Sequence, residues 1–261
     1  MSNIIVEKYL LRDLYSTLTK IENEVLGIVK NENVLGMNDD VDLLVPALTS
    51  SLSLLRQIII LCENGFPDGA LILARNIYEQ RVICSFIEEH EDVEKDELLK
   101  KYFQSEERTR LEYINDQSKR FNDIEYAEKT DKLINEHKNN NGSSYNQYWW
   151  SGKKTFKDIS AYVIKKDNVH TGLYNNMHME YKLACLVAHP SCFGNKINIG
   201  SSYGGIDMQA RINGQENALF LAVSSLIPLV GYTYHYLQLD EELVLNELNK
   251  MGIYYLQILQ S

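Results

Sequence analysis

The sequence predicts an all-α protein, a multi-helix, bundle-like single domain that covers residues 1–261. Apolar residues recur at spacings of three and four along most of the chain, which is typical of amphipathic helices. Only 4 prolines occur in 261 residues, so few positions forbid a helix. Hydrophobic residues make up 44% and charged residues 24% of the chain, which is typical of a folded globular protein.

The first predicted helix, residues 3–30, carries one narrow apolar stripe and is polar on its other faces. The stripe consists of Leu11, Leu14, Leu18, Ile21, Val25 and Ile28. Its narrowness favours a peripheral helix that lies on the domain surface. In the alternative, the stripe is a seam with a partner protein or with a second copy of the chain, as in a homodimer.

The second and third predicted helices are strongly apolar. Residues 41–63 form the second, with Pro46 in its first turns and the Asn64–Gly65 pair after its end. Pro67 begins the third, which runs to about Glu89 and is apolar on nearly every face. We therefore predict that the third helix lies in the core.

A long charged stretch follows, and residues 91–138 predict extended helices with a solvated face. The loop at 138–154 is a candidate hinge, because its centre is rich in Asn, Gly and Ser. Thr155 and Asp158 resemble a capping box and start a short helix.

The last third of the chain predicts three more helices. They cover residues 174–188, 216–239 and, with Asp240 as N-cap, 240–259. Between the first two, alternating residues permit a small β-hairpin near 196–212.

Charge and composition narrow the function classes. The net charge of −10 opposes a phosphate backbone, so extended DNA binding is not expected. The N-terminus lacks a signal-peptide core and the cysteines form no CxxC pair, so we expect reduced thiols and a cytoplasmic protein. Residues 217–239 contain no Asp, Glu, Lys or Arg, but their polar residues favour a buried central helix over a membrane span.

Arg75 and Glu79 are the first candidate site residues, because charges in an apolar helix need partners. They are four residues apart and share one helix face. They form either a structural ion pair or a site in which Arg75 holds an anion and Glu79 orients Arg75.

A second group of candidates follows on one stripe of the helix at 174–188. It consists of His178, Tyr181, Cys185 and His189, with Ser191 just beyond. His189 is a candidate for proton transfer and Tyr181 for positioning a substrate, whereas packing and capping roles are the alternative. No metal-ligand spacing occurs, so we predict no metal and no cofactor.

Trp150 and Lys153 belong to an aromatic and cationic loop, Trp149 to Lys154. Such a loop can stack on a base, or it can serve as an interface anchor or a lid over the core.

Two stretches together resemble a widespread bacterial family of helical domains of unknown function. One runs from Asn64 to Ala70 and on to Arg75 and Glu79; the other joins the Trp150–Lys153 segment to Tyr181 and the His189-Pro190-Ser191 end. The resemblance is looser to helical abortive-infection proteins, including the HEPN ribonucleases. Those carry Arg followed four to six residues later by His, an element that does not occur here.

Two function hypotheses follow. In the first, the chain is a bacterial stress or phage-defence effector that binds or acts on RNA or a nucleotide. Arg75, Glu79, His189 and Tyr181 would be its catalytic residues, in a metal-independent, ribonuclease-like hydrolase, and Trp150, Lys153 and Ser191 would bind substrate. In the second, the chain is a non-enzymatic sensor, adaptor or oligomerisation module.

Overall fold

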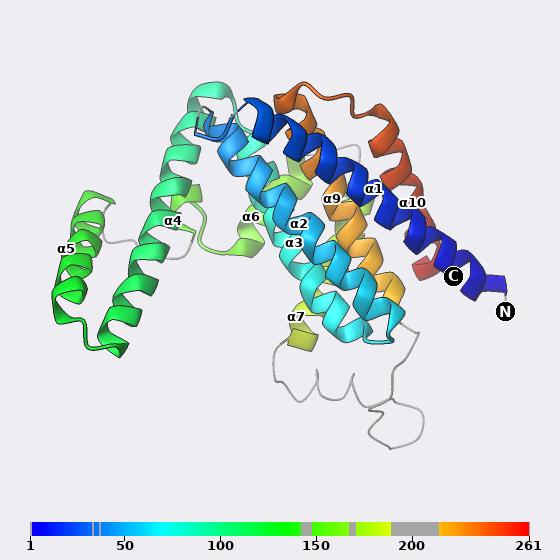
Figure 1. Ribbon diagram of the computed structural model, residues 1–261, viewed down its shortest axis with the longest axis horizontal. Coiled ribbons are helices and arrows are strands. Elements are labelled where there is room, and N and C mark those ends of the chain that lie inside the picture. The colour runs from blue at the N-terminus through cyan, green and yellow to red at the C-terminus, as the bar shows by residue number, and fades with distance from the viewer. Residues whose placement is uncertain are drawn as a thin grey trace, which may run out of the picture. The chain divides into compact units, whose positions relative to one another are not determined.

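The computed structural model describes residues 2–32, 34–36, 38–141, 148–166, 171–188 and 214–260. Within these ranges the chain forms nine α-helices and one short 3-10 helix and no strand (Figure 1). The predicted all-α fold is therefore confirmed. The hairpin predicted near 196–212 lies outside the described residues.

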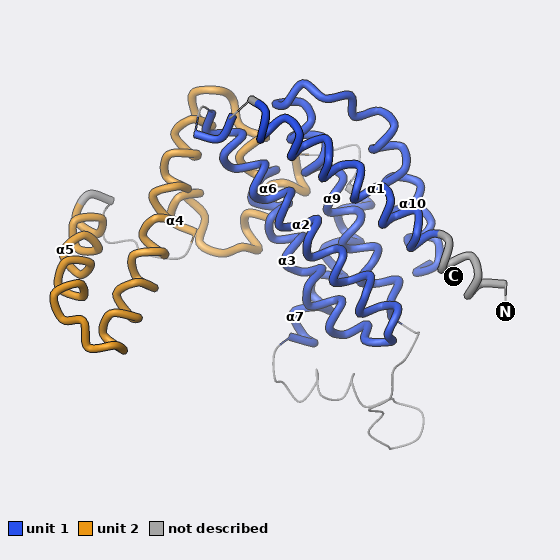
Figure 2. The backbone as a smooth tube through the Cα atoms, in the orientation of Figure 1, with its two compact units in different colours: residues 1–85, 167–261 blue, residues 86–166 orange. Residues whose placement is uncertain are grey.

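The chain divides into two compact units, which are coloured separately in Figure 2. Unit 1 comprises residues 1–85 and 167–261, and unit 2 comprises residues 86–166. Helix α3, Pro67–Glu88, contributes most of its length to unit 1 and its last turn to unit 2. The candidate hinge at 138–154 falls inside unit 2, and the single domain over 1–261 stays a prediction.

The centre of unit 1 is helix α9, Gln215–Leu237. It packs against α1 (Ser2–Glu32), α2 (Asp39–Glu63), α7 (Thr171–Ala188) and α10 (Glu242–Gln260). Fourteen of its 23 residues are buried. Partners on several sides explain why this helix has no continuous polar face.

Helices α2 and α9 are long and apolar enough to cross a membrane, by length and composition alone. Half of the apolar window of α2 and 72% of that of α9 are buried within the chain. Core helices of globular proteins have the same length and composition, so this property by itself assigns no location.

The apolar stripe of α1 is covered by the chain itself. Leu14, Leu18, Ile21 and Val25 are each 0% exposed, and α1 contacts α2, α9 and α10. Contacts within unit 1 therefore cover these four residues, and a partner protein or second copy at this helix stays a prediction.

Helix starts follow local capping chemistry. The Asn38 side chain accepts the amides of Asp40 and Val41, so α2 begins at Asp39, two residues before the predicted start. At α6 (Phe156–Lys166) the predicted capping box is present, because the Asp158 carboxylate accepts the Thr155 amide and the Thr155 hydroxyl accepts the Asp158 amide.

The prediction of Asp240 as the N-cap of the last helix was wrong. Helix α10 begins at Glu242, and the carbonyl of Glu241 accepts the first bond of the helix from the Leu245 amide. The Asp240 carboxylate instead accepts the Glu242 amide at 3.2 Å, which places Asp240 one residue outside the cap.

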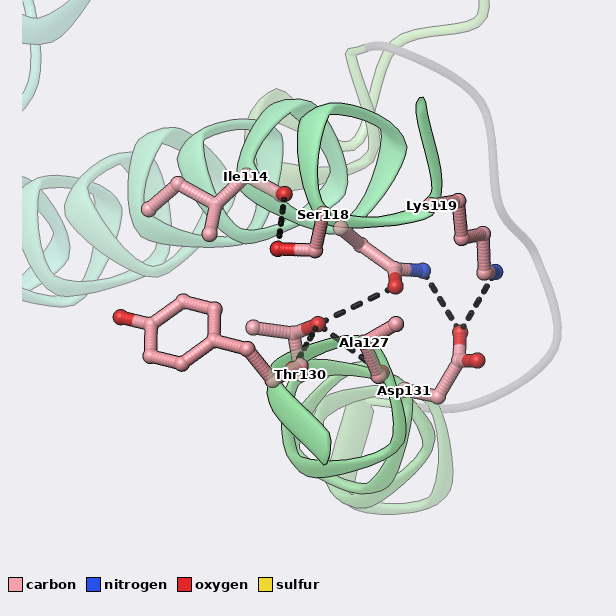
Figure 3. Close-up of polar contacts among 8 residues, drawn as sticks. Ile114, Ser118, Lys119, Ala127, Thr130 and Asp131 are labelled. Carbon is pink, nitrogen blue, oxygen red and sulfur yellow. Dashed lines mark hydrogen bonds and ion pairs between the residues drawn. The ribbon is translucent and has the colours of Figure 1, made fainter. Parts of the chain in front are cut away.

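In unit 2, α4 (Asp92–Arg120) and α5 (Ile124–Asn141) form an antiparallel hairpin. Its interface is partly polar, as Figure 3 shows. Asp131 accepts hydrogen bonds from Lys119 at 3.2 Å and from the Asn115 amide at 2.6 Å, and Thr130 donates to Asn115 at 3.1 Å. The buried polar atoms of this interface thus satisfy one another.

Candidate functional site

Helix α3 positions the first group of candidate residues. Gly65, with φ of 77°, turns the chain after α2, and Pro67 begins α3 with a preset φ and no amide to satisfy. The buried side of α3 carries mainly apolar residues, namely Ala70, Leu71, Ala74, Ile77, Tyr78 and Val82. The charged residues of α3 are therefore placed by the register of a helix whose apolar side is fixed in the core.

Arg75, Glu79 and Tyr181 come together between α3 and α7. Arg75 Nε donates to Glu79 Oε1 at 2.8 Å, and the Tyr181 hydroxyl donates to the same oxygen at 3.1 Å. The Arg75 guanidinium carbon lies 5.8 Å from the centroid of the Tyr181 ring. The Arg75 and Glu79 side chains remain 26% and 30% exposed.

The partial exposure of Arg75 and Glu79 helps to distinguish a structural ion pair from a binding site. A partly exposed ion pair contributes about 1 kcal/mol or less to stability, because water competes for both charges. If the role of this ion pair were structural alone, it would therefore add little to the stability of the fold. The guanidinium is instead held in place at one edge while its side chain still reaches solvent.

The electrostatics of the cluster keep Arg75 charged and Tyr181 neutral. Burial opposes the charged guanidinium, but the hydrogen bond and the attraction to Glu79 outweigh it and raise the pKa of Arg75. Burial, the Glu79 carboxylate and the Cys185 thiol all raise the pKa of Tyr181. The phenol therefore stays protonated and serves as a hydrogen-bond donor near neutral pH.

Two further contacts continue the same interface. The Tyr78 hydroxyl and His178 Nδ1 lie 3.4 Å apart, and the Tyr78 and Tyr181 rings are 4.8 Å apart. The Arg81 guanidinium lies 3.9 Å from the centroid of the Tyr174 ring.

The pairing order shows how the helices run. Rising positions on α3 (75, 78, 81) meet falling positions on α7 (181, 178, 174), so the two helices are antiparallel here. The result is a row of cations, phenols and an imidazole along the interface between α3 and α7. We call this row the α3–α7 ladder, and its members are Arg75, Tyr78 and Arg81 on α3 and Tyr174, His178 and Tyr181 on α7.

Trp150 and Lys153 lie in unit 2 within an aromatic cluster. The Trp150 ring is 3% exposed and packs edge-on against Phe86 at 5.8 Å and Tyr102 at 5.1 Å. Lys153 Nζ lies 5.0 Å from the centroid of the Tyr162 ring. These contacts give Trp150 a core role in unit 2, and its substrate role stays a prediction.

The remaining candidates cannot be placed in the ladder. His189 and Ser191 lie outside the described residues. Among the side chains that are described, no group of three His, Cys, Asp or Glu residues is arranged to hold a metal ion.

Comparison with protein families gives one match. Residues 41–204 match a family of unknown function, DUF5677, and this range is more than half of the chain. The chain belongs to the DUF5677 family. The match runs from the third residue of α2 to beyond α7 and thus includes every residue of the α3–α7 ladder. The predicted membership of a helical family of unknown function is confirmed, and the looser likeness to HEPN ribonucleases stays a prediction.

The family match brings no activity with it, because the DUF5677 family is itself of unknown function. No curated protein and no solved structure matches the chain. Any function must therefore be argued from the residues themselves.

Three members of the ladder were not predicted as site residues, namely Tyr78, Arg81 and Tyr174. His178 was among the candidates on the predicted helix at 174–188 but had no role of its own. The usable signal was the i, i+3, i+6 spacing of Arg75, Tyr78 and Arg81, which places the three on one slanting row of α3.

Proposed function

We propose that the α3–α7 interface of unit 1 binds a phosphate-bearing ligand, an RNA or a nucleotide, as in a bacterial stress or phage-defence effector. One observation carries the proposal. Glu79 holds Arg75 at Nε, and no described residue accepts a hydrogen bond from its two terminal amino groups, although the side chain is partly exposed. A guanidinium oriented in this way is suited to bidentate recognition of a phosphate.

The neighbours of Arg75 fit this role. Glu79 accepts from both Arg75 and Tyr181 through one oxygen, so the carboxylate ties the guanidinium to α7. The Tyr181 ring is half-buried and stacks near His178 at 6.0 Å. Aromatic faces beside a cation favour ligands that carry a base or another ring as well as a phosphate.

A catalytic version of the proposal needs a group that transfers protons. His178 supplies an imidazole within one turn of Tyr181, and His189 was predicted from the same stripe. Positioning, charge stabilisation and acid–base transfer are sufficient for metal-independent cleavage of a phosphodiester with a neighbouring hydroxyl. Under this proposal Arg75 stabilises the developing negative charge and an imidazole moves the proton.

The test is the affinity of the full chain for ATP and for a short single-stranded RNA, measured by calorimetry. Arg75→Ala should weaken binding about 10- to 100-fold, since a charge-assisted hydrogen bond contributes about 1.5–3 kcal/mol. Arg108→Ala is the matched control. Arg108 pairs with Glu112 at the same i, i+4 spacing and at 2.8 Å, but on α4. Unchanged affinity in Arg75→Ala would overturn the proposal.

Cleavage of the RNA in the presence of EDTA separates binding from catalysis. Turnover that is lost in Arg75→Ala and in His178→Ala, with both variants folded, supports the ribonuclease-like reaction. Binding without turnover supports a ligand sensor.

A second candidate function, an oligomerisation or adaptor module, rests on unit 2. Phe121 and Ile124, at the turn between α4 and α5, are 74% and 70% exposed. These two residues lie three apart in the chain, and contiguous exposed apolar surface is typical of contact surfaces. Light scattering over a range of protein concentrations tests it, because self-association should disappear in the Phe121→Ser/Ile124→Ser variant.

A further inference from the structure

Arg81 is the most deeply buried charged side chain among the described residues. It is 1% exposed and is the largest of the fully buried side chains. It lies on α3 one turn before Ser85, which is also 1% exposed and accepts a long hydrogen bond from Tyr232 on α9.

Within the described part of the chain, the guanidinium of Arg81 lacks the partners that a buried charge requires. Nε and Nη1 are both buried and have no hydrogen-bond partner among the described residues. No carboxylate of the described residues lies within 4.0 Å of it. The guanidinium carbon of Arg81 lies over the face of the Tyr174 ring, 3.9 Å from its centroid.

Other cations of low exposure have a carboxylate partner. Arg56 pairs with Glu22 at 2.6 Å, and Lys95, which is also buried, pairs with Glu88 at 2.9 Å. Arg81 is the more buried side chain and is the one without a carboxylate in the described part of the chain. A cation–π contact offsets only part of the desolvation cost of a guanidinium, so the site favours an incoming negative charge.

We propose that Arg81 anchors a second, buried site that binds one small oxyanion group, a phosphate or a carboxylate. The anion accepts hydrogen bonds from the guanidinium, and Tyr174 holds the plane of the guanidinium by stacking on it. Tyr174 is itself only half-buried, so one side of this contact reaches the surface of the chain.

The Arg81 site does not rest on the function proposed for Arg75. The two arginines lie six positions apart in the chain, which places them about 9 Å apart along α3 and about 120° apart around it. Arg75 has its carboxylate in Glu79, whereas Arg81 has none among the described residues. The two sites can therefore be tested separately.

The test compares the unfolding midpoint of the full chain in sodium chloride, sodium phosphate and sodium acetate at constant ionic strength. The native protein should show a saturable rise of the midpoint with the anion that binds. Arg81→Met should abolish that rise. It should also raise the midpoint of the anion-free protein or leave it unchanged, because it replaces an unpaired buried charge with an apolar side chain of similar length.

Matched variants isolate the site. Arg56→Met removes a guanidinium that has a carboxylate partner, so it should lower the midpoint yet keep the anion-dependent rise. Because Arg75 is itself proposed to bind a phosphate, the comparison is repeated in the Arg75→Ala background, where the rise that remains should disappear when Arg81→Met is added. Because phosphate stabilises most folded proteins nonspecifically, only the difference between the native chain and Arg81→Met counts.

The outcomes are decisive in both directions. A rise with phosphate alone, or with acetate alone, identifies the group that the site takes. A rise that is equal in the native chain and in Arg81→Met, or no rise with either anion, overturns the proposal. If Arg81→Met does not fold, Arg81→Lys serves instead, and it should weaken the rise several-fold because an ammonium lacks the planar fork.

Discussion

The burial of the α1 stripe makes a quantitative prediction about Leu18. This side chain is 0% exposed and lies between Leu14 and Ile21, which are also 0% exposed. Leu18→Ala removes about three carbon groups at about 0.8 kcal/mol each, or roughly 2.4 kcal/mol of transfer free energy. The cavity that remains raises the expected loss to about 2.7–5 kcal/mol. For a chain of this length the unfolding midpoint should fall by roughly 5–20 °C.

Calorimetry of the full chain at several protein concentrations tests this reasoning. Asn23→Ala is the control, because Asn23 lies on the exposed side of the same helix and should change the free energy of unfolding by no more than about 0.5 kcal/mol. The Leu18→Ala loss should not depend on protein concentration, since α2, α9 and α10 of the same chain cover the stripe. A loss below about 1 kcal/mol, or one that grows on dilution, would refute packing within the chain and point to a seam between two chains.

Three more measurements follow from the local chemistry. Asn38→Ala should lower the free energy of unfolding by about 1 kcal/mol in denaturant titration, because two amides of α2 lose their acceptor. The Arg56 hydrogen bond lowers the pKa of Glu22 below its ordinary 4.5. The stability that ionised Glu22 contributes is therefore complete above about pH 5 and is lost as the pH falls through the lowered pKa. The free energy of unfolding should accordingly fall less steeply with acid in Glu22→Gln than in the native chain. Burial raises the pKa of Cys62 to about 12, so mass spectrometry after brief alkylation at pH 8 should find Cys185, which is partly exposed, modified before Cys62; faster modification of Cys62 would contradict its burial.

Local features of the fold were predictable from the sequence wherever one segment contains the whole cause. The helix at α6 is an example, because the Thr155 and Asp158 side chains that cap it lie three residues apart. The N-cap of α10 was missed by one residue, because Asp240 and Glu241 both precede an apolar run and only the backbone geometry distinguishes them.

The role of the first helix was harder to assign. Its stripe was visible as a spacing of three and four and favoured a helix on the surface of its own domain, but a seam with another chain stayed open as the alternative. The contacts with α2, α9 and α10 show that helices more than a hundred residues away supply part of that cover. A periodic pattern records that a face is apolar, and it carries no information on which segment meets that face.

The candidate site likewise has a part that was predictable from one segment and a part that depends on the tertiary structure. The sequence by itself determined that Arg75 and Glu79 share a face of a mostly apolar helix, because four residues make about one helical turn. Only the tertiary structure decided that Tyr181 bonds to the same carboxylate and that Arg81 stacks on Tyr174, about a hundred residues away. Such pairings depend on the antiparallel register of α3 and α7, which is set by side-chain packing across the interface and not by periodicity within either helix.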